Sequence, residues 1–237
     1  MTTVVIGAGP GLGLSIAHRF GREGHAVALV SRNGGRHPGY LASLASAGIE
    51  ATSHPADVRD RDALLRALDE ITARHGAIDI VYYGPGAADP AALPVPITET
   101  DVPTAREGMS WVYPAIDTVG AVLPGMLERG DGGLLFAGGL SAVVPMPMIG
   151  NLALASAALR NYAVTLNAAL AGEGVYAGTL TIGGLIERGD IHRMATSDPD
   201  RLGDMTVRTL DPDKLANAAW DLYSKRDRAE AVFNVLT

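Results

Sequence analysis

The stretch GAGPGLGLSIAHRF, from Gly7 to Phe20, decides how the rest of the chain is interpreted. It follows a short apolar run, spaces its glycines as G-x-x-x-G-x-G and leads into an amphipathic helical pattern. Gly7 permits a tight turn, Gly11 lets the backbone approach a pyrophosphate, and Gly13 lets the helix lie close to the sheet, while free N–H groups at the helix start attract the anion. This context predicts a dinucleotide-binding turn, and the alternative is a purely structural glycine turn. The candidate cofactor contacts in it are Gly7, Gly9, Gly11, Leu12 and Gly13.

Apolar runs alternate with helical patterns along the chain. Each run is apolar on consecutive residues, as expected for parallel strands that are covered by helices on both faces. The runs are TVVIGAG, AVALVSR, IEATSHPADV, IDIVYYG, GGLLFAGG and VYAGTLTIGG, and helices are predicted near Leu12–Glu23, Arg61–His75, Thr104–Arg129, Leu152–Gly172 and Asp213–Lys225. The pattern predicts an α/β fold in which one doubly wound parallel sheet carries helices on both faces.

Two segments interrupt this alternation. Residues 84–103 hold five of the 14 prolines and are predicted to form a loop, and residues 185–211 are polar and irregular. Both follow the carboxyl end of a predicted strand, where ligands bind in open α/β sheets. Each segment is therefore a candidate pocket wall, with an ordinary solvated loop as the alternative.

The bulk composition fits one globular domain over residues 1–237. Of these residues 47% are hydrophobic and 19% charged, and none is cysteine, which excludes disulfides and thiolate chemistry. No basic segment precedes the first apolar run, and polar residues interrupt the weakly polar stretch 152–170, so we expect neither a secretory signal nor a membrane span. The net charge of −7 opposes nucleic-acid binding, and no clustered His and carboxylate residues indicate a metal site. We expect a soluble, cytoplasmic protein with a small-molecule ligand.

The end of the second predicted strand bears on which dinucleotide is bound. An acidic residue at this point accepts hydrogen bonds from the ribose 2′-OH of NAD, but the sequence here is ALVSRN. Ser31 and Arg32 can instead hydrogen-bond and neutralise a 2′-phosphate, which favours NADP(H) over NAD(H). The alternative for Arg32 is a solvated strand-end residue. Asp57 and Val58 follow the third strand, where the carboxylate could accept from an adenine amino group or cap the next helix.

Further motifs accompany the glycine turn. They are ADV at Ala56–Val58, IDIVYYGPGA, AVLPGMLERGDGGLLFAGG and ASAALRNY. With these motifs the chain resembles the short-chain dehydrogenase/reductase family along nearly its whole length. The resemblance implies a Rossmann-like domain that binds NAD(P), with Gly84 and Ser156 beside the cofactor. It also implies a homodimer or homotetramer packed through two long helices.

The same resemblance draws attention to four replaced positions. The family uses an asparagine, a serine, and a tyrosine and lysine spaced Y-x-x-x-K, in which the phenol gives or takes the proton and the lysine lowers its pKa. Counting from the flanking motifs places Trp111, Gly139, Leu152 and Ser156 at these four positions. The phenol–lysine acid is therefore missing from this alignment.

Two hydroxyl groups are candidate catalytic substitutes. Ser141 follows the fifth strand and Tyr83 ends the fourth, so both are expected to project toward the nicotinamide; the alternative for each is a hydroxyl satisfied by backbone or solvent. The first functional hypothesis is an NADP(H)-dependent oxidoreductase of atypical mechanism that acts on a small, mostly apolar molecule. The second is a non-redox protein on the same scaffold, either a nucleotide sensor, a regulatory partner or an enzyme for another reaction.

Overall fold

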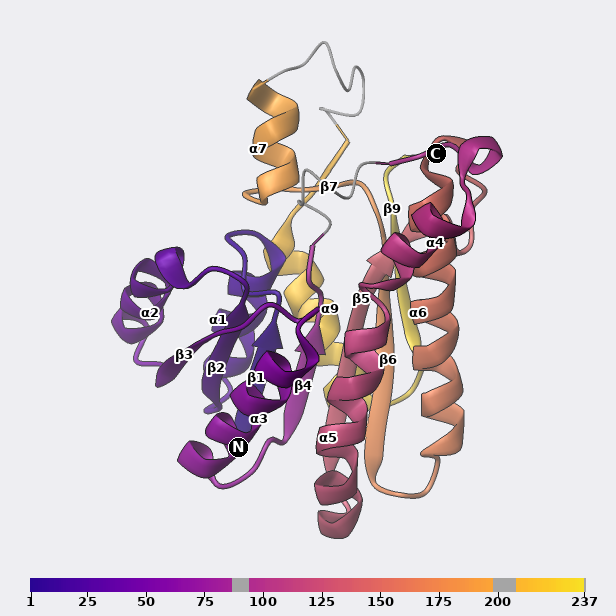
Figure 1. Cartoon of the computed structure of the whole chain (residues 1–237). Helices are drawn as coiled ribbons and strands as arrows, with labels where there is room; N and C mark the ends of the chain where they lie inside the picture. The colour runs from indigo at the N-terminus through magenta and orange to yellow at the C-terminus, as the bar shows by residue number, and fades with distance from the viewer. Residues whose placement is uncertain (87–93, 198–207, 237) are drawn as a thin grey trace.

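The computed structural model of the chain describes residues 1–86, 94–197 and 208–236. Seven parallel strands form one sheet in the order β3-β2-β1-β4-β5-β6-β9 (Figure 1). These strands are β1 (Thr2–Ile6), β2 (Ala26–Ser31), β3 (Ala51–Pro55), β4 (Ile80–Tyr83), β5 (Gly132–Gly139), β6 (Val175–Gly183) and β9 (Glu230–Asn234). A separate two-stranded parallel sheet joins β7 (Leu185–Ile186) to β8 (Thr209–Leu210).

Helices cover both faces of the large sheet (Figure 1). One face carries α3 (Arg61–His75), α5 (Tyr113–Arg129) and α6 (Gly150–Ala169), and the other carries α1 (Leu12–Gly21), α2 (His37–Ser46) and α9 (Pro212–Lys225). In β1, Val4 and Ile6 pack into the first layer and Val5 into the second. Because both faces are buried, the last three positions of β1 are apolar, and the predicted doubly wound α/β fold is confirmed.

The helix predicted over Thr104–Arg129 is in fact two helices, α4 (Val102–Met109) and α5. Between them the chain tightens into single turns, in which the N–H of Val112 donates to the carbonyl of Met109 at 2.8 Å. Pro114 then lies in the first turn of α5, where a missing N–H does no harm. The apolar periodicity continues through the break, so the pattern alone merges the two helices.

Five helices and strands of the described residues were not predicted from the sequence. Helix α2 has Pro38 and Gly39 in its first turn, and β9 is a short strand beyond β6. The segment 185–211 contains helix α7 (Asp190–Ser197) besides β7 and β8, while its residues 198–207 lie outside the described residues. In the predicted loop 84–103, residues 87–93 lie outside them as well. The described residues also contain four short turns of 3-10 helix: η1 (Gly34–Arg36), η2 (Ile97–Glu99), η3 (Leu140–Ala142) and η4 (Pro147–Ile149).

The strand order reverses between β1 and β4. From β1 the chain moves outward to β3, and it returns to place β4 on the other side of β1. Ligands of open α/β sheets bind in the crevice at such a reversal, outside the carboxyl ends of the strands. Gly7 follows β1 there, and Gly84 follows β4 and donates its N–H to the carbonyl of Ile6 at 2.9 Å. The glycine turn therefore lies at the point where the fold places a ligand.

None of the helices within the described residues is long and apolar enough to span a bilayer.

The packing around Gly13 predicts that even one methyl group is harmful there. A Cβ at Gly13 would lie 2.4 Å from the Gly7 carbonyl oxygen and 3.0 Å from the Cα of Ala8. Gly13→Ala should therefore lower the free energy of unfolding by about 1–3 kcal/mol, because α1 must move away from the turn. Chemical denaturation measures this change.

Gly39→Ala is the matched control, since Gly39 lies in helix α2 and a Cβ there would meet no atom within 4 Å. It should be neutral or raise the free energy of unfolding by up to about 1 kcal/mol, through the better helix propensity of alanine. Equal effects of the two substitutions would contradict the close packing of α1 against the turn.

Candidate functional site

The turn after β1 leaves no space for a side chain at Gly7 or at Gly13. Gly7 has a φ of +95°, and a Cβ on it would lie 2.4 Å from the Gly84 carbonyl oxygen. The N–H groups of Gly7 and Ala8 both donate to the carbonyl of Val30, at 2.9 and 3.1 Å, which ties the turn to the end of β2. These contacts bring the ends of β1, β2 and β4 together around one backbone turn.

The start of α1 is suited to an anion. No side chain among the described residues caps this end, and the first turn of the helix contains no acidic residue. Unpaired N–H groups and the helix dipole at such an end attract negative charge. Leu12 begins the helix, and Gly9 carries the carbonyl that accepts from the N–H of Leu14 at 2.9 Å. The predicted phosphate contacts therefore lie together at one helix terminus.

A segment from the other half of the chain lies against this turn. A Cβ on Gly11 would lie 3.0 Å from the Cα of Gly189 and 3.2 Å from the carbonyl oxygen of Glu187. The Glu187 carboxylate accepts from the hydroxyl of Thr209 at 2.7 Å, so β8 holds the segment in place. Local sequence patterns carried no signal for this contact, because the two backbones are far apart in the chain.

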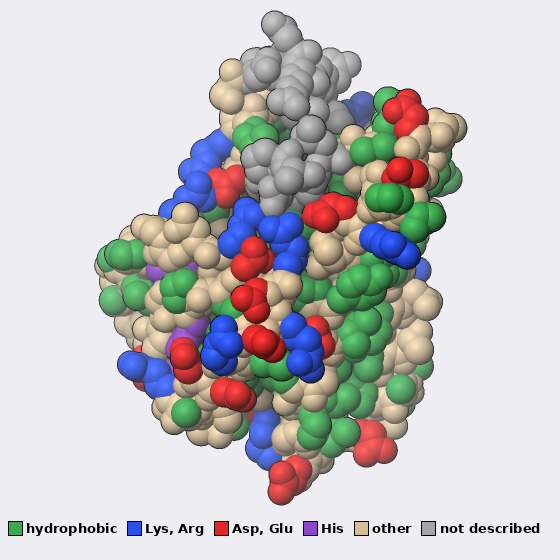
Figure 2. All heavy atoms as spheres, in the orientation of Figure 1, with side chains coloured by type: hydrophobic (Ala, Val, Ile, Leu, Met, Phe, Trp, Pro, Cys, Tyr) green, Lys and Arg blue, Asp and Glu red, His purple; other side chains and the backbone are tan. Residues whose placement is uncertain are grey.

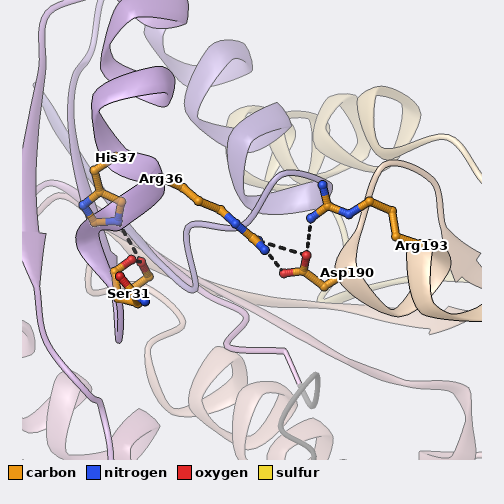
Figure 3. Close-up of polar contacts among 6 residues, drawn as sticks. Ser31, Arg36, His37, Asp190 and Arg193 are labelled. Carbon is orange, nitrogen blue, oxygen red and sulfur yellow. Dashed lines mark hydrogen bonds and ion pairs between the residues drawn. The ribbon is translucent and has the colours of Figure 1, made fainter.

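At the end of β2, a buried histidine orients Ser31 (Figure 3). Nε2 of His37 lies 2.7 Å from Oγ of Ser31, and Nδ1 lies 2.5 Å from Oγ of Ser53. Burial, and then the nearby His54, lower the pKa of His37, so its neutral ring donates at one nitrogen and accepts at the other. Sequence analysis missed His37 because its partners come from two different strands.

Arg32 is exposed directly after Ser31, and its charge acts on Asp57 at the end of β3. The Asp57 carboxylate accepts from the backbone N–H of Arg59 at 3.0 Å. Burial alone would raise the pKa of Asp57, but its hydrogen bonds with Arg59 and the neighbouring positive charges hold that pKa below the usual value. Helix α3 is capped by Asp60, so the alternative interpretation of Asp57 as the helix cap is wrong. Val58 beside it is buried.

Two hydroxyls meet where β5 ends. A Cβ on Gly139 would lie 3.1 Å from Oγ of Ser156 on α6 and 3.3 Å from Oγ of Ser141 in η3. The serine side chains thus flank the same small space, which a larger residue at position 139 would occupy. Leu152, one helical turn before Ser156, is half-buried and apolar. This part of the site offers hydrogen bonds from hydroxyls, which are very weak acids.

Trp111 adds one more donor. It is half-buried between α4 and α5, and the guanidinium of Arg59 lies over its ring, 4.8 Å from the ring centroid. Its indole Nε1 is buried with no hydrogen-bond partner within the described residues. An unpaired buried donor of this kind favours an acceptor supplied by a ligand or water.

Tyr83 does not lie where the sequence analysis expected it. Its side chain is 1% exposed in the core beside Phe136, and its hydroxyl donates to the carbonyl of Trp111 at 2.7 Å. Burial, and then the charge of Asp117, raise the pKa of this phenol far above its ordinary value. The phenol faces the helix layer of α3, α5 and α6, so we correct its assignment from catalytic substitute to buried structural residue.

The described residues contain no group of three or more His, Cys, Asp or Glu side chains positioned to hold a metal ion.

Comparison with protein families gives one extensive match. The model of a family described as "short chain dehydrogenase" matches residues 1–188. Among curated proteins, the chain is 27% identical over 182 residues to "Short chain dehydrogenase MYCFIDRAFT_6125" from Pseudocercospora fijiensis, a match that covers 77% of this chain and 59% of that protein. It is 30% identical over 188 residues to "1-deoxy-11-beta-hydroxypentalenate dehydrogenase" from Streptomyces exfoliatus, covering 76% of this chain and 66% of that protein. The chain thus spans less than two thirds of the length of both relatives.

Solved structures share the whole fold. L-sorbose reductase from Gluconobacter frateurii, complexed with NADPH and L-sorbose, matches 100% of this chain and 97% of its own with a TM-score of 0.86 and 21% identity. A hydroxysteroid dehydrogenase from Escherichia coli matches 100% and 96% with a TM-score of 0.81 and 18% identity. At these identities the likeness establishes the fold.

The burial of Tyr83 predicts a structural role for its hydroxyl. Tyr83→Phe should lower the free energy of unfolding by about 1–2 kcal/mol, because the Trp111 carbonyl loses a buried donor, and should leave nucleotide affinity and turnover unchanged. Thermal or chemical denaturation beside a nucleotide titration measures both quantities.

Tyr113→Phe is the control. It removes the same hydroxyl group, but from a tyrosine that is 52% exposed. It should change neither quantity. An unchanged stability of Tyr83→Phe combined with a hundredfold loss of turnover would restore Tyr83 as a proton donor.

Proposed function

The chain belongs to the short chain dehydrogenase family, and from that membership we propose that it is an NADP(H)-dependent oxidoreductase of atypical mechanism that acts on a small, mostly apolar molecule. The observation that carries the proposal is the glycine turn at the strand reversal, where close backbone contacts at Gly7 and Gly13 hold the start of α1, a helix terminus suited to an anion, beside the ends of β1 and β4. When bound, NADPH supplies a hydride. Everything else in the proposal concerns what this chain's own residues do.

The cofactor preference rests on the residues after β2. Ser31 and Arg32 offer a hydroxyl and a guanidinium where NAD-binding proteins place a carboxylate. A guanidinium pairs strongly with phosphate, so we propose that these two side chains hold the 2′-phosphate. Asp57 and Val58 would receive the adenine, while Gly84 and Ser156 would line the ribose and nicotinamide part of the cleft. The NADPH complex of the structurally similar L-sorbose reductase supports the capacity of this fold for that cofactor.

We propose that Ser141 is the main hydrogen-bond donor to the substrate, with Ser156 beside it. The two hydroxyls flank Gly139 and can polarise a carbonyl or related group. Leu152 adds an apolar wall, which favours a mostly apolar substrate. Hydroxyls transfer protons poorly, so the proton would come from water. A rate about 10²–10⁴-fold below that of a site with a positioned acid follows from this.

The replaced positions also favour a second candidate, a non-redox protein that keeps the nucleotide site. Leu152 stands where the family has an ionisable tyrosine, on the helix face that would carry the reaction. Gly139 stands where the family has a serine hydroxyl. A nucleotide sensor, a regulatory partner or an enzyme for another reaction would tolerate both changes. Turnover in the presence of NADPH distinguishes the two candidates.

A cytoplasmic location stays a prediction from the sequence.

We further propose a homodimer or homotetramer packed through α5 and α6. Ile116 and Leu127 on α5 and Leu154 on α6 are large apolar side chains that are 40–46% exposed, and Figure 2 shows hydrophobic side chains gathered over α5. The exposed positions of α6 are all uncharged: Leu154, Ala157, Asn161, Thr165, Ala168 and Ala169. A long helix without charge on its outer face is typical of a helix covered by another protein surface.

The role of Arg32 and the redox activity can be tested together. NADPH oxidation should be detectable with at least one member of a panel of carbonyl, enone and imine compounds. With that compound, Arg32→Ala should raise the KM for NADPH by about tenfold and leave the KM for NADH nearly unchanged, because one charge-assisted contact with phosphate is lost.

Arg74→Ala is the control, since Arg74 is exposed at the C-terminal end of α3 and its removal changes the net charge equally. It should affect neither KM. Tight NADPH binding without turnover of any compound would favour the non-redox candidate, and an unchanged KM in Arg32→Ala would contradict the assignment of the 2′-phosphate site.

The proposed assembly predicts that a charge on α5 separates the protomers. Ile116→Arg places a guanidinium where the interface would exclude water and should convert the oligomer to monomers, as measured by light scattering during gel filtration. Ile191→Arg is the control, because Ile191 is 41% exposed on α7, away from α5 and α6. A wild-type protein that is monomeric at micromolar concentration would refute the proposed assembly.

A further inference from the structure

An ion pair connects the residues after β2 with the start of α7. Nη1 of Arg36 donates to both carboxylate oxygens of Asp190, at 2.9 and 2.7 Å, although the residues are 154 positions apart in the chain. Arg193, one turn further along α7, donates to the same carboxylate (Figure 3). One carboxylate thus receives two guanidinium groups, and Arg36 ends the η1 turn that also follows Ser31.

The segment that carries Asp190 also lies on the glycine turn. Gly189, its immediate neighbour, is the residue against Gly11. Arg188 has a φ of +64°, pairs with Asp213 at 2.8 Å and donates to Oγ of Ser15 on α1 at 3.2 Å. Residues 187–190 therefore contact the start of α1 at one end and Arg36 at the other. They bridge the phosphate turn and the segment after β2, the two places to which we assigned the pyrophosphate and the 2′-phosphate.

Asp190 is charged at neutral pH. Its burial would raise its pKa, but the hydrogen bonds from Arg36 and Arg193 hold that pKa below the usual value. Arg36 in turn has a raised pKa, first through its hydrogen bond to Asp190. A carboxylate and a phosphate are alternative partners for the same planar donor groups of a guanidinium.

We propose that Asp190 is a specificity-determining residue whose carboxylate competes with the 2′-phosphate of NADP(H) for the guanidinium of Arg36. The inference rests on the proposed nucleotide site after β2. A nucleotide with a 2′-phosphate brings an anion that Arg36 can bind in place of Asp190, whereas a nucleotide with a free 2′-OH brings none. The ion pair between Arg36 and Asp190 therefore lowers the affinity for NADP(H) but not the affinity for NAD(H). The size of this decrease depends on the fraction of molecules in which the ion pair is formed. Exchange of Arg36 between the two anions would also release the start of α7 only when the phosphate is present.

The size of this effect is set by the exposure of the pair. The side chains of Arg36 and Asp190 are 56% and 33% exposed, so solvent screens their attraction. An ion pair of this kind is closed in most molecules without being locked. Removal of the competing charge should therefore tighten the binding of a 2′-phosphate by about three- to tenfold.

The test compares Asp190→Asn with the wild-type chain in calorimetric titrations. The probes are NADPH and NADH, together with 2′,5′-ADP and 5′-AMP, which lack the nicotinamide and report on the adenosine end alone. The substitution should tighten NADPH and 2′,5′-ADP about three- to tenfold and leave NADH and 5′-AMP within about twofold. In an Arg36→Ala background, Asp190→Asn should give much less of this gain, because the contested guanidinium is gone.

Asp221→Asn is the matched control. It removes the same charge from an exposed ion pair with Lys225 on α9 and should leave all four affinities unchanged. The proposal is overturned if Asp190→Asn weakens NADPH, which would make Asp190 a support for Arg36, or if it changes NADPH and NADH equally. If only this inference is wrong, the wild-type chain still binds NADPH. A wild-type chain that binds neither NADPH nor NADH would contradict both the proposed function and this inference.

Discussion

Backbone meets backbone where β1 and β4 end, and the rest of the site depends on that close approach. A Cβ on Gly7 would lie 2.4 Å from the Gly84 carbonyl oxygen, and one on Gly13 would lie 2.4 Å from the Gly7 carbonyl oxygen. Since no side chain intervenes, the start of α1 lies directly above the reversal of strand order. The same turn is hydrogen-bonded to Val30, which fixes the position of Ser31 and the residues that follow β2. One backbone arrangement therefore determines where an anion and its neighbouring groups can lie.

The two halves of the proposed site have different chemistry. The half around β1, β2 and α1 has glycines, a helix terminus that no described side chain caps, and arginines, a combination suited to phosphates. The half around β5 and α6 has Gly139, Leu152 and two serine hydroxyls, a combination suited to an apolar molecule with one or two hydrogen bonds. Family membership accounts for the first half. The second half is the reason that we propose an atypical mechanism, in which positioning contributes more than proton transfer.

Features set by local sequence could be predicted, and features set by distant contacts could not. The glycine turn and most strands of the large sheet depend on short-range spacing and on burial of both sheet faces, and the structure contains them. The orientation of Tyr83 was predicted wrongly because a strand that is apolar on both faces does not reveal which face a given residue takes. The break before Pro114 was missed because apolar periodicity continues across it. The contacts of His37 with Ser53, of Gly11 with Gly189 and of Arg36 with Asp190 join segments whose proximity only the fold creates.

The central claim is that this cleft binds NADP(H) and discriminates it from NAD(H) by the residues after β2. Calorimetric titration of the unmodified chain with NADPH, and separately with NADH, tests it most directly. The account predicts saturable binding of one NADPH per chain, with NADH bound about tenfold more weakly or worse for want of a charged phosphate contact. Binding of neither nucleotide, or NADH affinity equal to or higher than that for NADPH, would contradict it.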